Sequence, residues 1–171
     1  MQEGTLIDVR KSTKNTYLQT FHCRIIQRII STNTFLFRIG MTDNSLCTFC
    51  KSTSETLKHI LWDCRYVKKF IQEVKSFLLN SYNFQLNVGL TTWFFPTLAN
   101  SNSITILILI ITKLAIFKAR NSQCTPSIEM FHNLLKFEVE KEHNAAKTQR
   151  TLNNFFGKWG NVSQIVQTRH S

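Results

Sequence analysis

The 171-residue chain is poor in the residues that build tight turns, with only five Gly and two Pro. Sheet-rich folds need many such turns, because Gly and Pro supply the backbone angles that connect short strands. Their scarcity therefore argues against a sandwich or a barrel. Hydrophobic residues make up 43% of the chain and include fourteen Phe, which argues against disorder. One folded domain with a sizeable core is expected.

Acidic residues are also scarce. Ten Asp and Glu stand against 21 Lys and Arg, so the formal net charge is +11 and the pI is about 9.7. A basic excess of this size indicates a polyanionic partner, most often nucleic acid, although it can serve solubility alone. The three aspartates, Asp8, Asp43 and Asp63, are never adjacent. They do not form the carboxylate cluster that holds the two metal ions of nucleotidyl transfer.

Residues 1–10 contain no apolar segment of a secretory signal, so an intracellular location, in the nucleus or the cytoplasm, is expected. In that reducing setting the five cysteines favour metal ligation over disulfides. Cys23 and Cys124 stand apart from the other three cysteines. Cys23 falls within a helical pattern and is expected to be half-buried.

Three cysteines and a histidine fall within eighteen positions, in the pattern C-x2-C-x8-H-x4-C formed by Cys47, Cys50, His59 and Cys64. Thiolates and imidazole are the donors that tetrahedral Zn²⁺ prefers. The two-residue gap lets one tight knuckle point both sulfurs at one ion, and His59 and Cys64 would close the site from a short helix and its end. Four protein ligands leave no position for water, so the pattern predicts a structural zinc ion. The alternative is chance clustering.

Apolar periodicity predicts a mostly α fold, a small helical domain with the Cys3His zinc knuckle between helices. Helices are expected over residues 17–30, 34–39, 65–80 and 103–120, and helical patterns recur after Pro126 and over residues 152–159. The Ile- and Leu-rich run from residue 104 could alone be a buried strand, but its continuation to Phe117 favours a buried helix. A membrane span would need about twenty apolar residues, and Lys113 and Lys118 interrupt this one.

The expected order of segments follows from these patterns. A polar lead-in over residues 1–16 precedes a helical zinc-binding module over residues 17–80. An irregular packed loop over residues 81–102 follows, then a C-terminal helical segment over 103–160 and a tail over 161–171. Within the C-terminal segment, residues 140–150 are nearly all polar and are expected to project into solvent.

Several stretches resemble the C-terminal part of LINE-type (non-LTR) retrotransposon reverse transcriptases. Upstream of the knuckle these are YLQTFHCRIIQRII (17–30) and TNTFLFRIG (32–40). LCTFC (46–50), ETLKH (55–59) and WDC (62–64) are similar to that family's zinc-binding segment in order and spacing. AIFKAR (115–120) and the Pro-Ser pair at 126–127 resemble its extreme C-terminus. The resemblance covers about residues 12–159.

The resemblance implies a large protein that also carries an endonuclease and a polymerase domain, neither of which is found in these residues. The chain therefore looks like a fragment: a decayed copy, a truncated reading frame or an excised module without catalytic activity. The polymerase domain of a full-length reverse transcriptase would be a partner. The uncharged stretch over residues 76–112 would have packed against that domain, and its loss would leave an exposed apolar patch.

The resemblance also implies that the module binds template RNA or target DNA. Phosphate contacts are expected from basic residues around the predicted knuckle, namely Lys51, Lys58, Arg65, Lys68, Lys69 and Lys75, and from Arg24 and Arg28. Arg24 and Arg28 are four residues apart and would share a helix face, which would either be solvated or touch phosphate. Phe49 and Trp62 could stack on unpaired bases, but a core position above the metal is favoured for both. Neither a membrane nor a small-molecule substrate is expected as a partner.

Two other function classes are alternatives to nucleic-acid binding. In the first, the module is a protein-interaction or scaffold domain in which zinc replaces missing core. In the second, it is an enzyme, but His22 and Cys23 are adjacent on a helix and would diverge instead of forming a base–nucleophile pair. His132 and His143, with the nearby glutamates, do not follow a metallohydrolase spacing. No independent catalysis is therefore expected.

Overall fold

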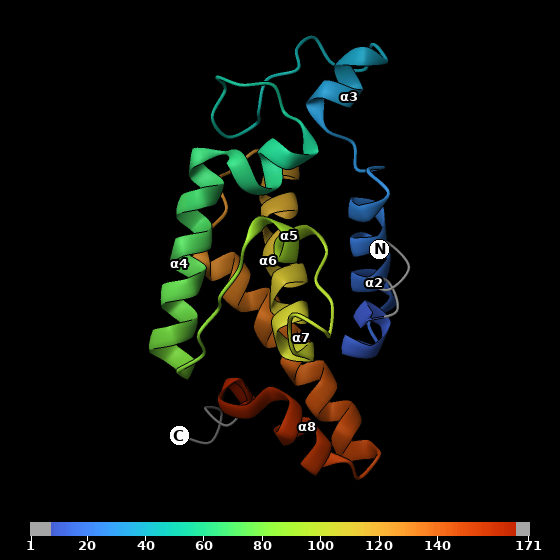
Figure 1. Cartoon of the computed structure of the whole chain (residues 1–171), viewed down its shortest axis with the longest axis vertical. Coiled ribbons are helices and arrows are strands. Elements are labelled where there is room, and N and C mark those ends of the chain that lie inside the picture. Colours follow the sequence, from blue (N-terminus) through green and yellow to red (C-terminus); the bar gives the residue numbers. More distant parts are fainter. Residues whose placement is uncertain (1–7, 167–171) are drawn as a thin grey trace.

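The computed structural model describes residues 8–166, and within that range it contains helices but no strand (Figure 1). Its elements are α2 (Thr16–Ile26), α3 (Asn33–Arg38), η1 (His59–Asp63), α4 (Arg65–Tyr82), α5 (Leu90–Phe94), α6 (Ser103–Asn121), α7 (Ile128–Thr148), α8 (Leu152–Trp159) and η2 (Gly160–Val166). A single residue pair in the described part, Leu46 and Ser54, forms an isolated antiparallel bridge. The predicted mostly α fold, with a Cys3His cluster between helices, is confirmed.

Helix α6 is the centre of the molecule and lies between α4 and α2 (Figure 1). Its Ile and Leu side chains are buried on every face, and so is Lys113. A helix that is apolar all round must be surrounded, and α6 packs against α2, α4, α7, α8 and η1. The Asn102 side chain caps its start by accepting from the Thr105 N–H. The buried helix expected over residues 103–120 is thus confirmed, and no helix within residues 8–166 is long and apolar enough to cross a membrane.

Helix α4 is amphipathic and turns one apolar face toward this core. Its buried residues are Val67, Phe70, Ile71, Val74, Leu78 and Tyr82. The helix runs two residues beyond its expected end and stops at Asn83, which adopts a left-handed φ of 49°. One continuous hydrophobic cluster includes these residues and extends from Val9 to Ile165. The metal-binding segment and the C-terminal helices therefore share a core.

The end of α7 is largely exposed, as expected, but one side of it is covered. Here α8 and η2 fold back against it, as Figure 1 shows at the bottom of the view. Glu142 accepts from Lys158 Nζ at 2.7 Å and from Trp159 Nε1 at 2.8 Å. In the predicted tail, Val162 and Ile165 are buried in η2, and residues 167–171 lie outside the described range. Most of residues 140–150 are exposed, as their polar sequence predicts, but the sequence gives no sign that one of their carboxylates is bound by residues further along the chain.

The N-terminal part contains a helical turn that was not expected, and its first expected helix is shorter than predicted. Residues 8–12 of the expected lead-in are helical and place Val9 in the core, while residues 1–7 lie outside the described range. Helix α2 ends at Ile26 and not at residue 30. The Ile29 N–H bonds to the Arg24 carbonyl at 3.0 Å, and Arg28 takes a left-handed φ of 58°. Ile29 and Ile30 continue the helical periodicity in sequence but belong to the turn that terminates the helix.

The expected irregular loop over residues 81–102 contains the short helix α5, whose Trp93 is fully buried. The uncharged stretch over residues 76–112 is largely covered by the chain itself. Its exposed large apolar side chains, within the described residues, are Leu79, Leu90 and Leu98. The broad apolar patch expected there is therefore reduced to separate positions.

Candidate metal centre and its basic surroundings

The structure brings together the four residues expected to bind a metal. The donor atoms of Cys47, Cys50, His59 and Cys64 all lie within 4.8 Å of one another. Cys50 Sγ is 3.4 Å from His59 Nε2, and Cys47 Sγ is 3.9 Å from Cys64 Sγ. A tetrahedral zinc ion with bond lengths of about 2.0–2.3 Å places its donors roughly 3.5–3.8 Å apart. These two separations match the edges of such a tetrahedron.

The first two donors lie on a tight turn that begins at the isolated bridge. The Cys47 N–H donates to the Thr53 carbonyl at 2.8 Å, and the Lys51 N–H donates to the Cys47 carbonyl at 3.0 Å. Lys51 closes the turn with a left-handed φ of 53°. This geometry points Cys47 and Cys50 toward the same side, as the two-residue gap predicts.

The other two donors are joined by a π-helical turn, η1. In an α-helix, residues five apart are rotated by about 140° about the axis, so His59 and Cys64 would diverge. The Cys64 N–H instead bonds to the His59 carbonyl at 2.9 Å, which is the i→i+5 pattern of a π-helix. The wider turn brings position i+5 back beneath position i. The short helix predicted here is present, but its π form is what makes the H-x4-C spacing suitable for one ion.

The environments of the two knuckle thiols differ. Burial raises the pKa of the Cys47 thiol to about 12, although backbone hydrogen bonds from Cys50 and Phe49 oppose this shift. Burial also raises the pKa of the Cys50 thiol, but hydrogen bonds from Ser52 and His59 outweigh it and lower that pKa to about 5. Cys50 thus presents a thiolate at neutral pH, the form in which cysteine binds metals.

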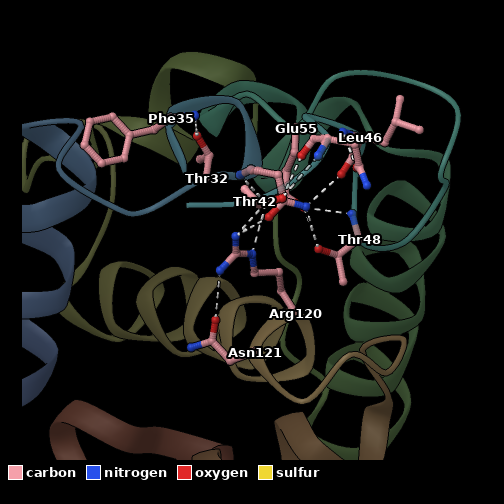
Figure 2. Close-up of polar contacts among 10 residues, drawn as sticks. Thr32, Phe35, Thr42, Leu46, Thr48, Glu55, Arg120 and Asn121 are labelled. Atoms are coloured by element: carbon pink, nitrogen blue, oxygen red, sulfur yellow. Dashed lines mark hydrogen bonds and ion pairs between the residues drawn. The ribbon is translucent and has the colours of Figure 1, made fainter. Parts of the chain in front are cut away.

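Glu55 is a fully buried carboxylate that holds the knuckle in place (Figure 2). Its Oε2 accepts from both the Thr48 N–H and the Thr48 hydroxyl at 2.7 Å, inside the turn between Cys47 and Cys50. Its Oε1 accepts from the Asn33 N–H at 3.0 Å, at the start of α3. The stretch ETLKH (55–59), which resembles the family, includes Glu55, but nothing in the sequence indicates this role.

The charge of Glu55 is balanced by Arg120, at the end of α6. Arg120 Nη2 lies 2.9 Å from Glu55 Oε1, and Arg120 Nε donates to the same oxygen at 3.0 Å. The guanidinium also donates to the side-chain carbonyls of Asn33 at 2.9 Å and Asn121 at 3.2 Å. Figure 2 shows Arg120 reaching up from α6 into the loop that carries the knuckle. The metal-binding segment is therefore pinned to the central helix.

Most of the basic residues expected to contact phosphate are exposed near this centre. Lys68, Lys69 and Lys75 line a hollow of about 440 Å³ on α4, together with Trp62 and Val88. Arg65 is exposed at the start of α4 and Lys51 on the knuckle. Two of these expected contacts have acidic neighbours, because Lys69 lies 3.8 Å from Glu73 and Lys58 lies 3.1 Å from Asp63. Such exposed ion pairs are weak and leave the lysines accessible to other anions.

Arg24 and Arg28 do not form the pair that their spacing suggests. Arg24 lies in the last turn of α2 and borders hollows beside that helix, whereas Arg28 lies beyond the helix end. Arg28 instead lines a cavity together with Lys58. The prediction of a shared helix face was wrong because it assumed that α2 continues to residue 30.

The aromatic residues beside the knuckle are mainly structural. Phe49 is buried, so the core position favoured for it is confirmed, whereas Trp62 packs against Trp93 at the edge of the core, with ring centroids 5.5 Å apart. Trp62 remains half-buried at the edge of the lysine-lined hollow. His22 is fully buried beside Lys113, and Cys23 is half-buried on the next position of α2.

The two histidines of α7 contact aromatic rings. His132 packs edge-on against Phe77, and His143 packs against Phe155. These contacts give both histidines a place in the packing of the helical bundle.

Comparison with known proteins gives one family match. Residues 10–70 match the family described as zinc-binding in reverse transcriptase, and this range contains all four residues of the Cys3His cluster. Searches of curated proteins and of solved structures gave no match. The match supports a reverse transcriptase zinc-binding domain in residues 10–70, and with the Cys3His cluster it supports a zinc-binding module.

Proposed function

We propose that this chain is a non-catalytic module of a LINE-type reverse transcriptase that binds a structural zinc ion and grips RNA or DNA through phosphate contacts. The observation that carries the proposal is the convergence of three thiols and one imidazole, within 4.8 Å, inside the residues that match the family. The donor set fits zinc because sulfur and imidazole nitrogen are its preferred ligands. Four protein donors complete a tetrahedron, so the ion would organise the fold and would not activate water.

The nucleic-acid part of the proposal rests on the placement of charge. The zinc ligand Cys64 is followed immediately by α4, so a bound ion would fix the start of the helix that carries Arg65, Lys68, Lys69 and Lys75. Release of counterions from phosphates would then supply much of the affinity. The LINE-type assignment rests on the sequence resemblance over residues 12–159, and a polymerase domain is the partner it implies.

Charge reversal on α4 tests phosphate binding. The variant K68E/K69E is compared with K141E/K147E, which makes the same change in net charge on exposed residues of α7. Binding of a fluorescent single-stranded RNA, and of a DNA of equal sequence, is followed by anisotropy across a salt titration. Loss of two phosphate contacts should lower the slope of log affinity against log salt by about 1.4 for a single strand. Equal binding and equal slopes for the two variants would contradict the proposal.

A second candidate function, a protein-interaction domain, is favoured by α3. This helix has no buried residue, and large apolar side chains on it and just after it are exposed: Phe35, Phe37, Ile39 and Met41. Such clustered apolar exposure is typical of contact surfaces. If this is the main function, F37S should abolish association with a polymerase domain while leaving the salt-dependent nucleic-acid binding unchanged, and K68E/K69E should leave that association intact.

A further inference from the structure

A cavity of about 720 Å³ opens between the end of α2, the residues just before η1, and α5. Its walls are mainly apolar and come from Ile25, Ile26, Leu57, Leu90, Phe94 and Phe95. The two isoleucines are buried, whereas Phe94 and Phe95 are half-buried and Leu90 is exposed. The volume lies within the range of about 300–1,000 Å³ that is usual for ligand sites. The cavity is therefore accessible and large enough to take flat apolar groups.

The charged side chains that line this cavity, among the described residues, are both cations. Arg28 comes from the turn after α2, and Lys58 comes from the metal-binding segment one residue before the predicted ligand His59. The ion pair of Lys58 with Asp63 is solvent-exposed, so an incoming anion can compete for the lysine. An apolar hollow flanked by cations complements a ligand with flat apolar faces and regularly spaced anions.

Arg28 occupies a backbone position that normally takes glycine. It follows the cap of α2 with φ of 58°, and the Arg28 N–H bonds to the Ile25 carbonyl at 3.1 Å. Gln123 and Arg150 share this strained conformation at the ends of other helices, so the backbone alone does not single out Arg28; the position of its side chain at the cavity does. Replacing Arg28 by glycine would relieve the strain but would remove the guanidinium from the rim of the cavity.

We propose that this cavity receives unstacked bases of a single-stranded nucleic acid, while Arg28 and Lys58 hold the adjacent phosphates. The inference rests on the proposed function and assigns it a second contact region besides α4. Phe94 and Phe95 offer ring surfaces on which a base can stack, which is how single strands are commonly held without sequence preference. A duplex keeps its bases stacked on one another and cannot fill the cavity. An acidic amphipathic peptide is the competing occupant, and the excess of positive charge around the knuckle favours nucleic acid.

Two closely matched variants test whether the charge of Arg28 contributes to binding. Arg150 has a φ of 56° in the turn after α7 and repeats the hydrogen-bond pattern of Arg28, but it lies outside the cavity. R28G and R150G thus remove the same charge from the same backbone geometry, and both relieve the strain. R28G should lower the salt slope of single-strand binding by about 0.7, whereas R150G should leave it unchanged. Equal slopes would overturn the assignment of Arg28.

A variant that fills the cavity tests whether unstacked bases bind there. Thr91 is exposed and lines the cavity, so T91W should occupy it without disturbing the core; S81W adds the same ring to an exposed position on α4 as a control. The probe is a short single strand containing 2-aminopurine, whose emission changes when the base leaves its stack and packs against protein. T91W should abolish that change and weaken single-strand binding about tenfold, the size of one lost stacked base. It should leave binding of a duplex of equal length unaltered.

The outcomes separate this inference from the function on which it rests. If the wild-type chain binds neither strand form in a salt-dependent manner, the proposed function fails and this inference fails with it. If it binds both forms, but T91W and R28G behave like their controls, only the cavity assignment is overturned. Loss of binding to an acidic amphipathic peptide in T91W, with single-strand binding retained, would also overturn it and would identify a peptide as the occupant.

Discussion

The Arg120 guanidinium lies 2.9 Å from the fully buried Glu55 carboxylate and joins the metal-binding knuckle to the last turn of α6. The two residues are 65 positions apart. Glu55 also holds Thr48 between two of the proposed ligands, so Arg120 supports the knuckle without touching any of them. This contact explains how a loop with little regular structure keeps a defined shape. It also means that the residues matching the zinc-binding family depend on a residue outside the match.

Removal of Arg120 should therefore weaken both the fold and the metal site. R120A leaves the Glu55 charge buried without its partner, which typically costs about 3–5 kcal/mol in the free energy of unfolding. Because Glu55 orients the knuckle, zinc affinity should fall by about 10–100-fold. Denaturant unfolding and chelator competition measure the two effects. K118A, an exposed residue on the same helix, is the control, and similar values for both variants would disprove the coupling.

If the zinc site is as proposed, replacing a cysteine inside the cluster should abolish metal binding, whereas replacing one outside it should not. Purified wild-type chain should hold one zinc ion, and so should C124S, because Cys124 is exposed and stands outside the cluster. C64S should hold none. Structural zinc of this kind contributes about 10–16 kcal/mol near neutral pH, so a chelator should unfold at least residues 46–70 of the wild type. Metal analysis and circular dichroism with and without chelator check this, and retention of helical structure and metal by C64S would contradict it.

The buried Lys113 should make stability depend on pH. Its Nζ donates to the Trp93 carbonyl at 2.7 Å, and burial lowers its pKa to about 7. An unfolded lysine has a pKa of about 10.4, so between these values the unfolded chain binds more protons than the folded chain. Stability should therefore rise with pH across this window, by up to about 1.4 kcal/mol per pH unit, and this contribution should be lost as the pH falls toward 7.

The variant K113M isolates that contribution, because methionine cannot titrate. Unfolding free energies of the two proteins are compared from pH 7 to about 10. Any stability advantage of K113M over the wild type should shrink as the pH rises. Parallel pH profiles would show that the charge of Lys113 does not differ between the folded and unfolded chains.

The end of α6 offers a test of backbone strain. Gln123 has a φ of 53°, and the Cys124 N–H bonds to the Ala119 carbonyl at 3.0 Å, so Gln123 takes the place that usually belongs to glycine. Q123G should raise the free energy of unfolding by about 1 kcal/mol, because glycine adopts this conformation without strain. The neighbouring Ser122 has a negative φ, and S122G should lower stability by about 0.5–1 kcal/mol. Thermal unfolding of the two variants should therefore move in opposite directions.

The features that sequence analysis predicted well are local ones. The C-x2-C spacing is short enough that a tight turn brings Cys47 and Cys50 close, whereas the H-x4-C pair also needs the π-helical turn of η1, which the spacing does not reveal. The long apolar run of α6 could only be covered on all sides, because no polar face interrupts it. The failures also have a local origin, since Ile29 and Ile30 continue a helical pattern across a turn, and the polar residues 140–150 give no sign that α8 packs against one side of them.

Local patterns are enough to predict the helical class, the central buried helix and the four residues of the Cys3His cluster, because each depends on periodicity or on spacing between near neighbours. Tertiary packing is needed to show that Glu55 is buried, that Arg120 neutralises it, and that Arg28 shares a cavity with Lys58 and not a face with Arg24. These relationships join residues from distant parts of the chain. A buried charge is tolerated only where packing brings its partner, and no local pattern records which distant residue that will be.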